Sequence, residues 1–153
     1  MALPSGGRYT VLIVDDNREL LALITDALNL LGEYTVVTAE NGTDGLLRAI
    51  ETRPDCLVID IKMSGLDGYQ LVRALRGDPA TAAIPLVILT ALTQEKYHLA
   101  GLLAGADQYL TKPTKPQELV EAIQAAIGLS DAERQQRLHA LAFEPSSDES
   151  GDS

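Results

Sequence analysis

Two kinds of apolar pattern alternate along most of the chain. Short runs rich in Val, Ile, Leu and Thr are typical of β-strands, and longer segments with apolar residues three or four positions apart are typical of α-helices. We expect strands at residues 9–14, 35–39, 56–60, 86–89 and 108–111. We expect helices at residues 17–31, 43–52, 68–76 and 93–104, and a fifth between a capping box, formed by Thr114 and Gln117, and a stop at Gly128.

The clearest strand patterns are continuous rather than alternating. Residues 11–14, 56–59 and 86–89 are apolar at every position. Strands of a parallel sheet that helices cover on both faces have this composition. The alternation of strands and helices therefore predicts an α/β fold, in which helices wind both faces of a five-stranded parallel sheet to give a three-layer sandwich.

Composition and charge indicate which kinds of partner the protein is expected to lack. The formal net charge of −10 disfavours direct binding to nucleic acid, because such binding depends on Lys and Arg contacts to phosphates. No apolar run approaches the roughly 18 residues of a membrane span, and the first residues lack a secretory signal pattern. The single cysteine, Cys56, excludes an internal disulfide and is expected to be a core residue. We therefore expect a cytoplasmic protein with no direct contact to membrane or nucleic acid.

Polar side chains follow four of the predicted strands. They are, in chain order, Asp15, Asp16, Asp60, Thr90 and Lys112. The carboxyl ends of parallel strands lie at one edge of the sheet, where open α/β proteins bind their ligands. We therefore expect these side chains to meet in one site.

Each of these residues also has a structural interpretation when it is taken alone. Asp16 and Asn17 are both suited to capping the helix that follows, and Asp60 to a solvated strand end. The threonine and the lysine are ordinary residues at a strand end and at a surface. Asp67, in contrast, most simply caps the third helix.

Taken together, the acids and the lysine suit phosphoryl chemistry. Carboxylates at close range repel one another unless a cation lies between them, and Mg²⁺ prefers such oxygen ligands together with waters and phosphate oxygens. Lys112 would complete the charge balance around a phosphoryl group, and the Thr90 hydroxyl could bind a further phosphoryl oxygen. A carboxylate can itself be the nucleophile and form an aspartyl-phosphate, and phosphoryl transfer depends mainly on positioning and electrostatic stabilisation.

Four segments resemble the receiver domain of two-component response regulators. They are VLIVDDN (11–17), LVIDIKMSGLDGYQL (57–71), PLVILTA (85–91) and GADQYLTKPTKPQEL (105–119). With the spacing of strands and helices, the resemblance covers residues 9–128. It implies a chemotaxis-type, flavodoxin-like (βα)5 fold with strand order 2-1-3-4-5.

The resemblance also implies a phosphorylation site and its metal. Asp60 would be the phospho-accepting residue. Mg²⁺, with Mn²⁺ as a substitute, would be held by Asp15, Asp16, Asp60 and the backbone carbonyl of Lys62.

Further roles follow from the same resemblance. The phosphoryl oxygens would contact the side chains of Thr90 and Lys112 and the backbone of Ala91. Tyr109 would be the switch aromatic that turns as Thr90 moves, and the peptide bond between Lys112 and Pro113 would be cis.

The resemblance finally implies partners. A sensor histidine kinase or a histidine phosphotransfer protein would supply the phosphoryl group, and phosphorylation would shift an existing equilibrium between inactive and active forms. The surface of the fourth helix, fifth strand and fifth helix would contact a downstream protein or a second copy in a homodimer. The chain would catalyse only its own phosphorylation and dephosphorylation and would not otherwise be an enzyme.

A few positions depart from the commonest family pattern. Ser64 stands where proline is usual, Thr114 where Phe is frequent and Gln108 where Asp is frequent. None of these removes a chemical group from the site. Leu92 lies two residues after Thr90, where the family tunes loss of the phosphoryl group, and its bulk predicts a long-lived phosphorylated state.

Two other classes fit less well. A haloacid-dehalogenase-like Mg²⁺ phosphatase needs an Asp-x-Asp pair after the first strand, whereas Asp15 and Asp16 are adjacent. It also needs a cap insertion, for which the chain has little room. A flavodoxin-like nucleotide binder needs a phosphate-binding loop where this chain has two acids.

The chain outside the predicted receiver domain, residues 9–128, is short. Residues 1–8 are an N-terminal extension, residues 129–143 are an extra helix or a linker, and residues 144–153 are an acidic segment expected to be disordered. No effector motif follows the domain. We expect a stand-alone receiver, with the receiver portion of a longer regulator as the alternative.

Overall fold

A computed structural model describes most of the predicted receiver domain. The described residues are 9–31, 34–62, 67–91 and 94–128. The predicted N-terminal extension, the predicted helix or linker and the acidic segment lie outside these residues, as do Ser64 and Leu92.

Strands and helices alternate along the described chain. They are β1 (Tyr9–Val14), α1 (Arg18–Leu30), β2 (Tyr34–Ala39), α2 (Gly42–Thr52), β3 (Cys56–Ile59), α3 (Gly68–Gly77), β4 (Leu86–Thr90), α4 (Glu95–Ala104), β5 (Gln108–Thr111) and α5 (Pro116–Ile127). The strands form one parallel sheet in the order β2-β1-β3-β4-β5. The predicted α/β class, parallel sheet and strand order are confirmed.

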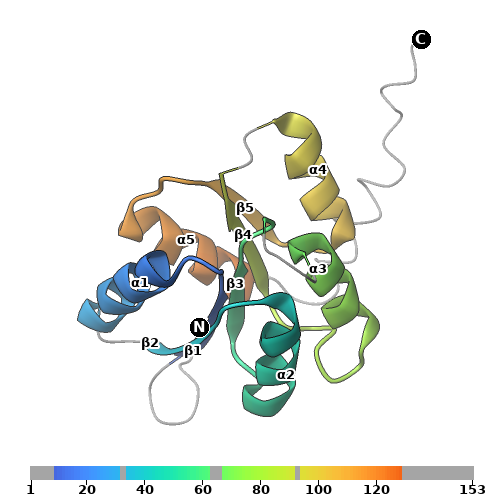
Figure 1. The fold of residues 1–153 in the computed structure, drawn as a ribbon, viewed down its shortest axis with the longest axis horizontal. Helices are drawn as coiled ribbons and strands as arrows, with labels where there is room; N and C mark the ends of the chain where they lie inside the picture. The colour runs from blue at the N-terminus through green and yellow to red at the C-terminus, as the bar shows by residue number, and fades with distance from the viewer. Residues whose placement is uncertain (1–8, 32–33, 63–66, 92–93, 129–153) are drawn as a thin grey trace.

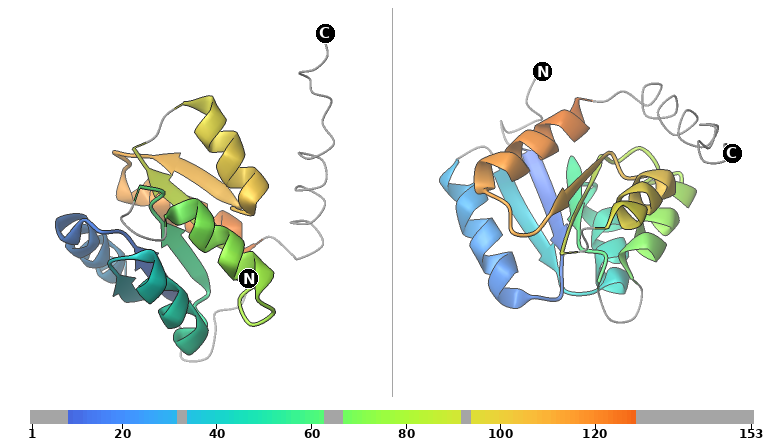
Figure 2. Two further views of the ribbon diagram at one scale, coloured as in Figure 1. Left: turned by 45° about the vertical axis from the view of Figure 1, so that its right-hand side comes forward. Right: turned by 90° about the horizontal axis from the view of Figure 1, so that it is seen from above.

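Helices cover both faces of the sheet. Helices α1 and α5 lie on one face, and α2, α3 and α4 lie on the other (Figures 1 and 2). Because successive strand residues point to opposite faces, Val11 and Ile13 pack in the core beside α1 and α5. Leu12 and Val14 pack in the core beside α2 and α3. Each core therefore takes alternate residues of the same strand.

The continuous apolar runs are the central strands. Every residue of β3 and β4 is buried, as expected for a sheet that is covered on both sides. Cys56, the first residue of β3, is fully buried, as the apolar pattern around it predicts. Among the described residues, no helix combines the length and the apolar character needed to cross a membrane.

Asx residues cap three of the helices. The side-chain oxygen of Asn17 accepts a hydrogen bond from the Leu20 N–H at the start of α1, and Asn41 caps α2 in the same way. Asp67 forms a capping box with Gln70 at the start of α3. The predicted capping role of Asp67 is therefore confirmed.

The predicted capping box of α5 is wrong by one residue. The helix begins at Pro116 rather than after Thr114, and the residue before it is Lys115. The carboxylate of Glu118 accepts hydrogen bonds from the Lys115 N–H at 3.2 Å and from the Thr114 hydroxyl at 2.8 Å. Proline is favoured at the first helical position because it has no N–H to leave unpaired, and the capping-box partner is therefore Glu118 rather than Gln117.

A buried ion pair links the ends of four elements away from the predicted site. The Arg76 guanidinium, at the end of α3, contacts Asp107 Oδ2 at 3.2 Å. It also donates to the carbonyl oxygens of Ala82, Ile84 and Gly105. The same Asp107 oxygen accepts the N–H of Leu86 at 2.8 Å. This network joins α3 to the start of β4 and to the turn between α4 and β5.

Candidate functional site

Three acids meet at the carboxyl edge of the sheet. Asp15 follows β1, Asp16 follows Asp15, and Asp60 follows β3. Carboxylate oxygens of the three lie within 4.8 Å of one another. Asp15 and Asp60 are 3% and 7% exposed, whereas Asp16 is exposed to solvent. The three acids therefore lie together, as the sequence predicts.

Backbone hydrogen bonds hold the two buried acids just beyond the strands. The N–H of Asp60 donates to Val14 O at 3.0 Å, and the N–H of Asp15 donates to Ala39 O at 3.1 Å. These bonds continue the ladders between neighbouring parallel strands, in which Val14 is paired with Ile59. The sheet itself thus fixes how far apart the two acids lie.

Lys112 bridges the two buried acids from the end of β5. Its Nζ lies 2.8 Å from Asp15 Oδ2 and 3.2 Å from Asp60 Oδ2. Its backbone N–H donates to Thr90 O at 2.7 Å. The peptide bond between Lys112 and Pro113 is cis, as predicted.

The charged groups of the cluster shift the pKa of Asp15 and of Lys112. Burial raises the pKa of Asp15, and the nearby Asp60 charge adds to this, while hydrogen bonds from Lys112 and the Asn17 N–H oppose it. Burial alone would lower the pKa of Lys112, but its hydrogen bond to Asp15 and the charges of Asp15 and Asp60 raise it. Lys112 therefore stays protonated, and it faces more than one carboxylate.

A glycine allows the start of α3 to lie against the backbone of Asp60 and Ile61. A β-carbon at Gly68 would lie 2.6 Å from Asp60 O and 2.6 Å from Ile61 Cα. The Gly68 N–H donates to Ile61 O at 3.0 Å, and the Lys62 N–H reaches Asp60 Oδ1 at 3.3 Å. Any larger residue at position 68 would displace the backbone that carries Asp60. Periodicity did not indicate this role for Gly68, because the contact forms only in the fold.

Thr90, Ala91 and Tyr109 are predicted site residues on β4, after β4 and on β5. Thr90 is the fully buried last residue of β4, and Ala91 after it is exposed. Tyr109 lies on β5 and packs with Ile61 and Ile88. The Thr90 carbonyl oxygen accepts the hydrogen bond from the Lys112 N–H.

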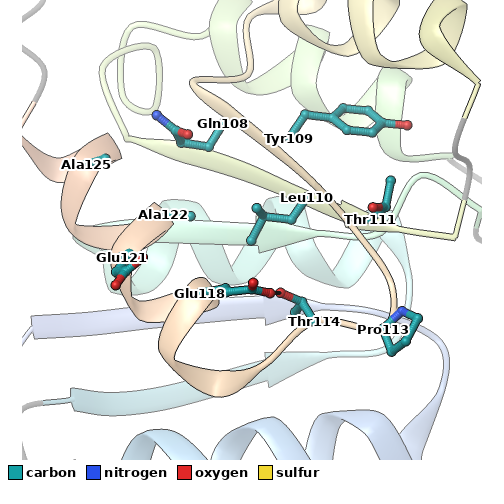
Figure 3. A pocket seen from close by; sticks show the side chains of 10 residues that line it. All are labelled: Gln108, Tyr109, Leu110, Thr111, Pro113, Thr114, Glu118, Glu121, Ala122 and Ala125. Atoms are coloured by element: carbon teal, nitrogen blue, oxygen red, sulfur yellow. Dashed lines mark hydrogen bonds between the residues drawn. The ribbon is translucent and has the colours of Figure 1, made fainter.

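A separate pocket of about 480 Å³ lies between β5 and α5. Figure 3 shows Leu110 pointing toward α5, and Tyr109 on the other side of the strand. The hydrogen bond between Thr114 and Glu118 crosses the rim of this pocket (Figure 3). Two of the three positions at which the chain departs from the commonest pattern, Gln108 and Thr114, line this pocket. Neither residue belongs to the acid cluster.

The fold and the acid cluster define a class of protein, the phospho-receivers of two-component signalling. The chain belongs to the response regulator receiver domain family, whose model matches residues 11–124. The expected resemblance is thus confirmed.

Individual relatives differ in length. Protein PilH of Pseudomonas aeruginosa is 40% identical over 117 residues, which are 76% of this chain and 96% of PilH. The phosphate regulon transcriptional regulatory protein PhoB of the same organism is 36% identical over 139 residues, 89% of this chain but 60% of PhoB. The chain thus spans nearly all of the first relative and about three fifths of the second.

A solved structure supports the same family. The receiver domain of the sensor histidine kinase PA1611 from Pseudomonas aeruginosa superposes with a TM-score of 0.73 at 31% identity, covering 80% of this chain and 99% of that one. That receiver holds a magnesium ion in its active-site cleft.

Proposed function

We propose that the protein is a phosphorylation-dependent switch of a two-component phosphorelay and that Asp60 accepts the phosphoryl group. The observation that carries this proposal is the contact of one lysine, Lys112, with two buried carboxylates beside the exposed Asp16. Such a site concentrates both signs of charge where a phosphoryl group would need them.

The hydrogen bonds favour Asp60 over Asp15 as the acceptor. Asp15 Oδ1 accepts the Asn17 N–H at 2.9 Å, and Oδ2 contacts Lys112 at 2.8 Å. The contacts of Asp60 are longer, 3.3 Å to the Lys62 N–H and 3.2 Å to Lys112. A weakly held oxygen is more available to form a new bond, so Asp60 is the better nucleophile.

The proposed transfer takes place in one displacement. A carboxylate oxygen of Asp60 attacks the phosphorus of a phosphohistidine on a sensor kinase or a phosphotransfer protein. The P–O bond forms as the P–N bond breaks, and the leaving imidazole nitrogen takes up a proton. Lys112, already paired with Asp60, would pair with an oxygen of the transferred group.

The donor set fits a hard divalent cation. The carboxylates of Asp15, Asp16 and Asp60 are all oxygen donors, and a single lysine does not balance their charge. We propose that these acids and the carbonyl of Lys62 hold Mg²⁺, with Mn²⁺ as a substitute. When bound, the cation would offset the charge on the phosphoryl oxygens. The magnesium in the related PA1611 receiver supports this assignment.

Thr90, Ala91 and Tyr109 would convert phosphorylation into a change of surface. We propose that the Thr90 hydroxyl and the Ala91 backbone bind phosphoryl oxygens and that Tyr109 turns when Thr90 moves. The hydrogen bond from the Lys112 N–H to Thr90 O supports a direct link between site and switch. The face formed by α4, β5 and α5 would then control a downstream protein or a homodimer.

The output of the protein is proposed to be protein contact rather than DNA binding. Nearly complete coverage of PilH supports a stand-alone receiver at residues 9–128, and the net charge of −10 disfavours nucleic acid as a partner. The partial coverage of PhoB favours a second candidate, the receiver portion of a longer regulator.

Phosphoryl uptake tests the acceptor. The protein is incubated with Mg²⁺ and acetyl phosphate, and its intact mass is measured. We expect one added phosphoryl group in the wild type and in Asp67→Asn, because Asn can still cap α3. We expect none in Asp60→Asn. Uptake by Asp60→Asn at the wild-type level would show that another residue is the acceptor.

A further inference from the structure

Gly101 occupies an unusual position in α4. It lies inside the helix, where glycine is among the least favourable residues, and it is buried. Among the α4 residues whose side chains are described, it is the only buried one. Among the described residues of the helix, the most deeply buried one therefore has no side chain.

The space next to Gly101 is filled by two residues of the sheet. A β-carbon at this position would lie 2.7 Å from Ile88 Cδ1, and 3.0 and 3.2 Å from Cδ2 and Cε2 of the Tyr109 ring. Ile88 is fully buried in β4 and is paired with Tyr109 across the strands. Because the core around Ile88 is close-packed, a side chain at position 101 would have to move the tyrosine ring or the helix.

The residues that Gly101 lies against are on the same face of the sheet as Thr90, and they pack with the residue after Asp60. Ile88 and Thr90 are two residues apart on β4 and so point to the same face of the sheet. Ile88 and Tyr109 also pack in a cluster with Ile61, the residue after Asp60. Gly101 thus lies against two side chains of the cluster that contains Ile61, the residue after the proposed acceptor.

We propose that Gly101 is a positioning residue for the switch, which rests on the function proposed above. The missing β-carbon lets α4 lie close to β5 and keeps the Tyr109 ring in the orientation described here. The side chain at position 101 therefore sets the balance between the two orientations of Tyr109, and with it the ease of phosphorylation.

The ring of Tyr109 provides a direct test. The protein is labelled with 3-fluorotyrosine, and the fluorine NMR signal of Tyr109 is assigned from its loss in Tyr109→Phe. We expect Gly101→Ala to shift this signal before any phosphodonor is added. We also expect the rate of phosphoryl uptake from acetyl phosphate to change by about two- to tenfold, the effect of moving one side chain off its preferred rotamer.

A double-mutant comparison separates positioning from helix propensity. In a Tyr109→Ala background the ring contact is absent, so Gly101→Ala should leave the uptake rate unchanged. In an Ile88→Val background, which removes Cδ1, the shift of the Tyr109 signal should persist. Gly77→Ala is the matched control, because a β-carbon there would meet nothing within 4 Å, and it should change neither readout.

The outcomes distinguish this proposal from the proposed function. An unmoved Tyr109 signal in Gly101→Ala, or the same rate change with and without the Tyr109 ring, would overturn the role of Gly101. Uptake by Asp60→Asn would overturn the acceptor instead and would leave the fluorine signal as the test of Gly101. Thermal unfolding of Gly101→Ala establishes that the variant is folded in both measurements.

Discussion

Lys112 is the residue on which the candidate site depends most. It is the one cation whose contacts with both buried acids are described, and its backbone is bonded to Thr90. The side chain therefore offsets repulsion between Asp15 and Asp60, and the main chain connects the same residue to the end of β4. The side chain of Lys112 thus supplies the positive charge, and its backbone N–H fixes the residue at the end of β4.

Substitution of Lys112 tests its electrostatic role. Lys112→Met keeps most of the apolar stem but removes the charge, so we expect phosphoryl uptake to slow by about 10²-fold, the usual loss when one preorganised donor is removed. Initial rates with acetyl phosphate and Mg²⁺ measure this effect. Lys115→Met, at the exposed start of α5, should keep the wild-type rate. A fast Lys112→Met variant would mean that the lysine contributes little beyond the resting ion pair.

At the scale of elements, the Arg76–Asp107 network holds together the edge of the fold opposite the acids. Asp107 is 1% exposed and accepts from both a guanidinium and a backbone N–H. Arg76 satisfies three carbonyl oxygens at the same time. Loss of one partner would leave several buried polar groups unpaired, and such groups are costly.

We expect Asp107→Ala to lower the free energy of unfolding by about 3–5 kcal/mol, because it leaves a largely buried guanidinium without its counter-ion. Urea unfolding followed by circular dichroism measures the change. Glu40→Ala is the comparison, because it breaks the Arg18–Glu40 pair, whose side chains are 81% and 47% exposed. We expect that loss to be under about 1 kcal/mol. Equal losses in the two variants would contradict the contrast between buried and exposed pairs.

The elements and the acids were predictable from the sequence, but the contacts that position them were not. Continuous apolar runs identify β3 and β4, and polar residues after strands identify Asp15, Asp60 and Lys112, because both signals are local. Gly68 and Gly101 carry no local signal, since each matters only for an atom of a distant segment. The start of α5 was misplaced because Thr114 and Gln117 matched a capping pattern that Pro116 overrides.

At the scale of the whole molecule, the proposed cation site would couple cation binding to stability. Repulsion among the acids disfavours the folded state, and a cation bound there would reduce this repulsion. A ligand that binds only the folded protein stabilises it by about 2.7 kcal/mol at a concentration of 100 times its dissociation constant.

We therefore expect Mg²⁺ to raise the midpoint of thermal unfolding. Asp16→Asn should weaken this shift, while its exposed position should leave folding intact. Glu19→Gln is the control, an acid of the first turn of α1 that is outside the cluster, and it should keep the full shift. Sodium chloride at matched ionic strength should not reproduce the effect. A shift of the same size in Asp16→Asn would argue against a ligand role for Asp16.

The burial of the only cysteine makes its thiol a built-in probe of local unfolding. Cys56 begins the strand that ends beside Asp60, the proposed acceptor, and its thiol is fully buried. A thiol reagent can therefore modify it only when β3 opens. The rate of that modification reports how often the strand that leads to Asp60 opens, and it needs no label or engineered residue. Rates measured before and after phosphoryl uptake can be compared. The difference gives the change in local stability of β3 between the two states of the protein.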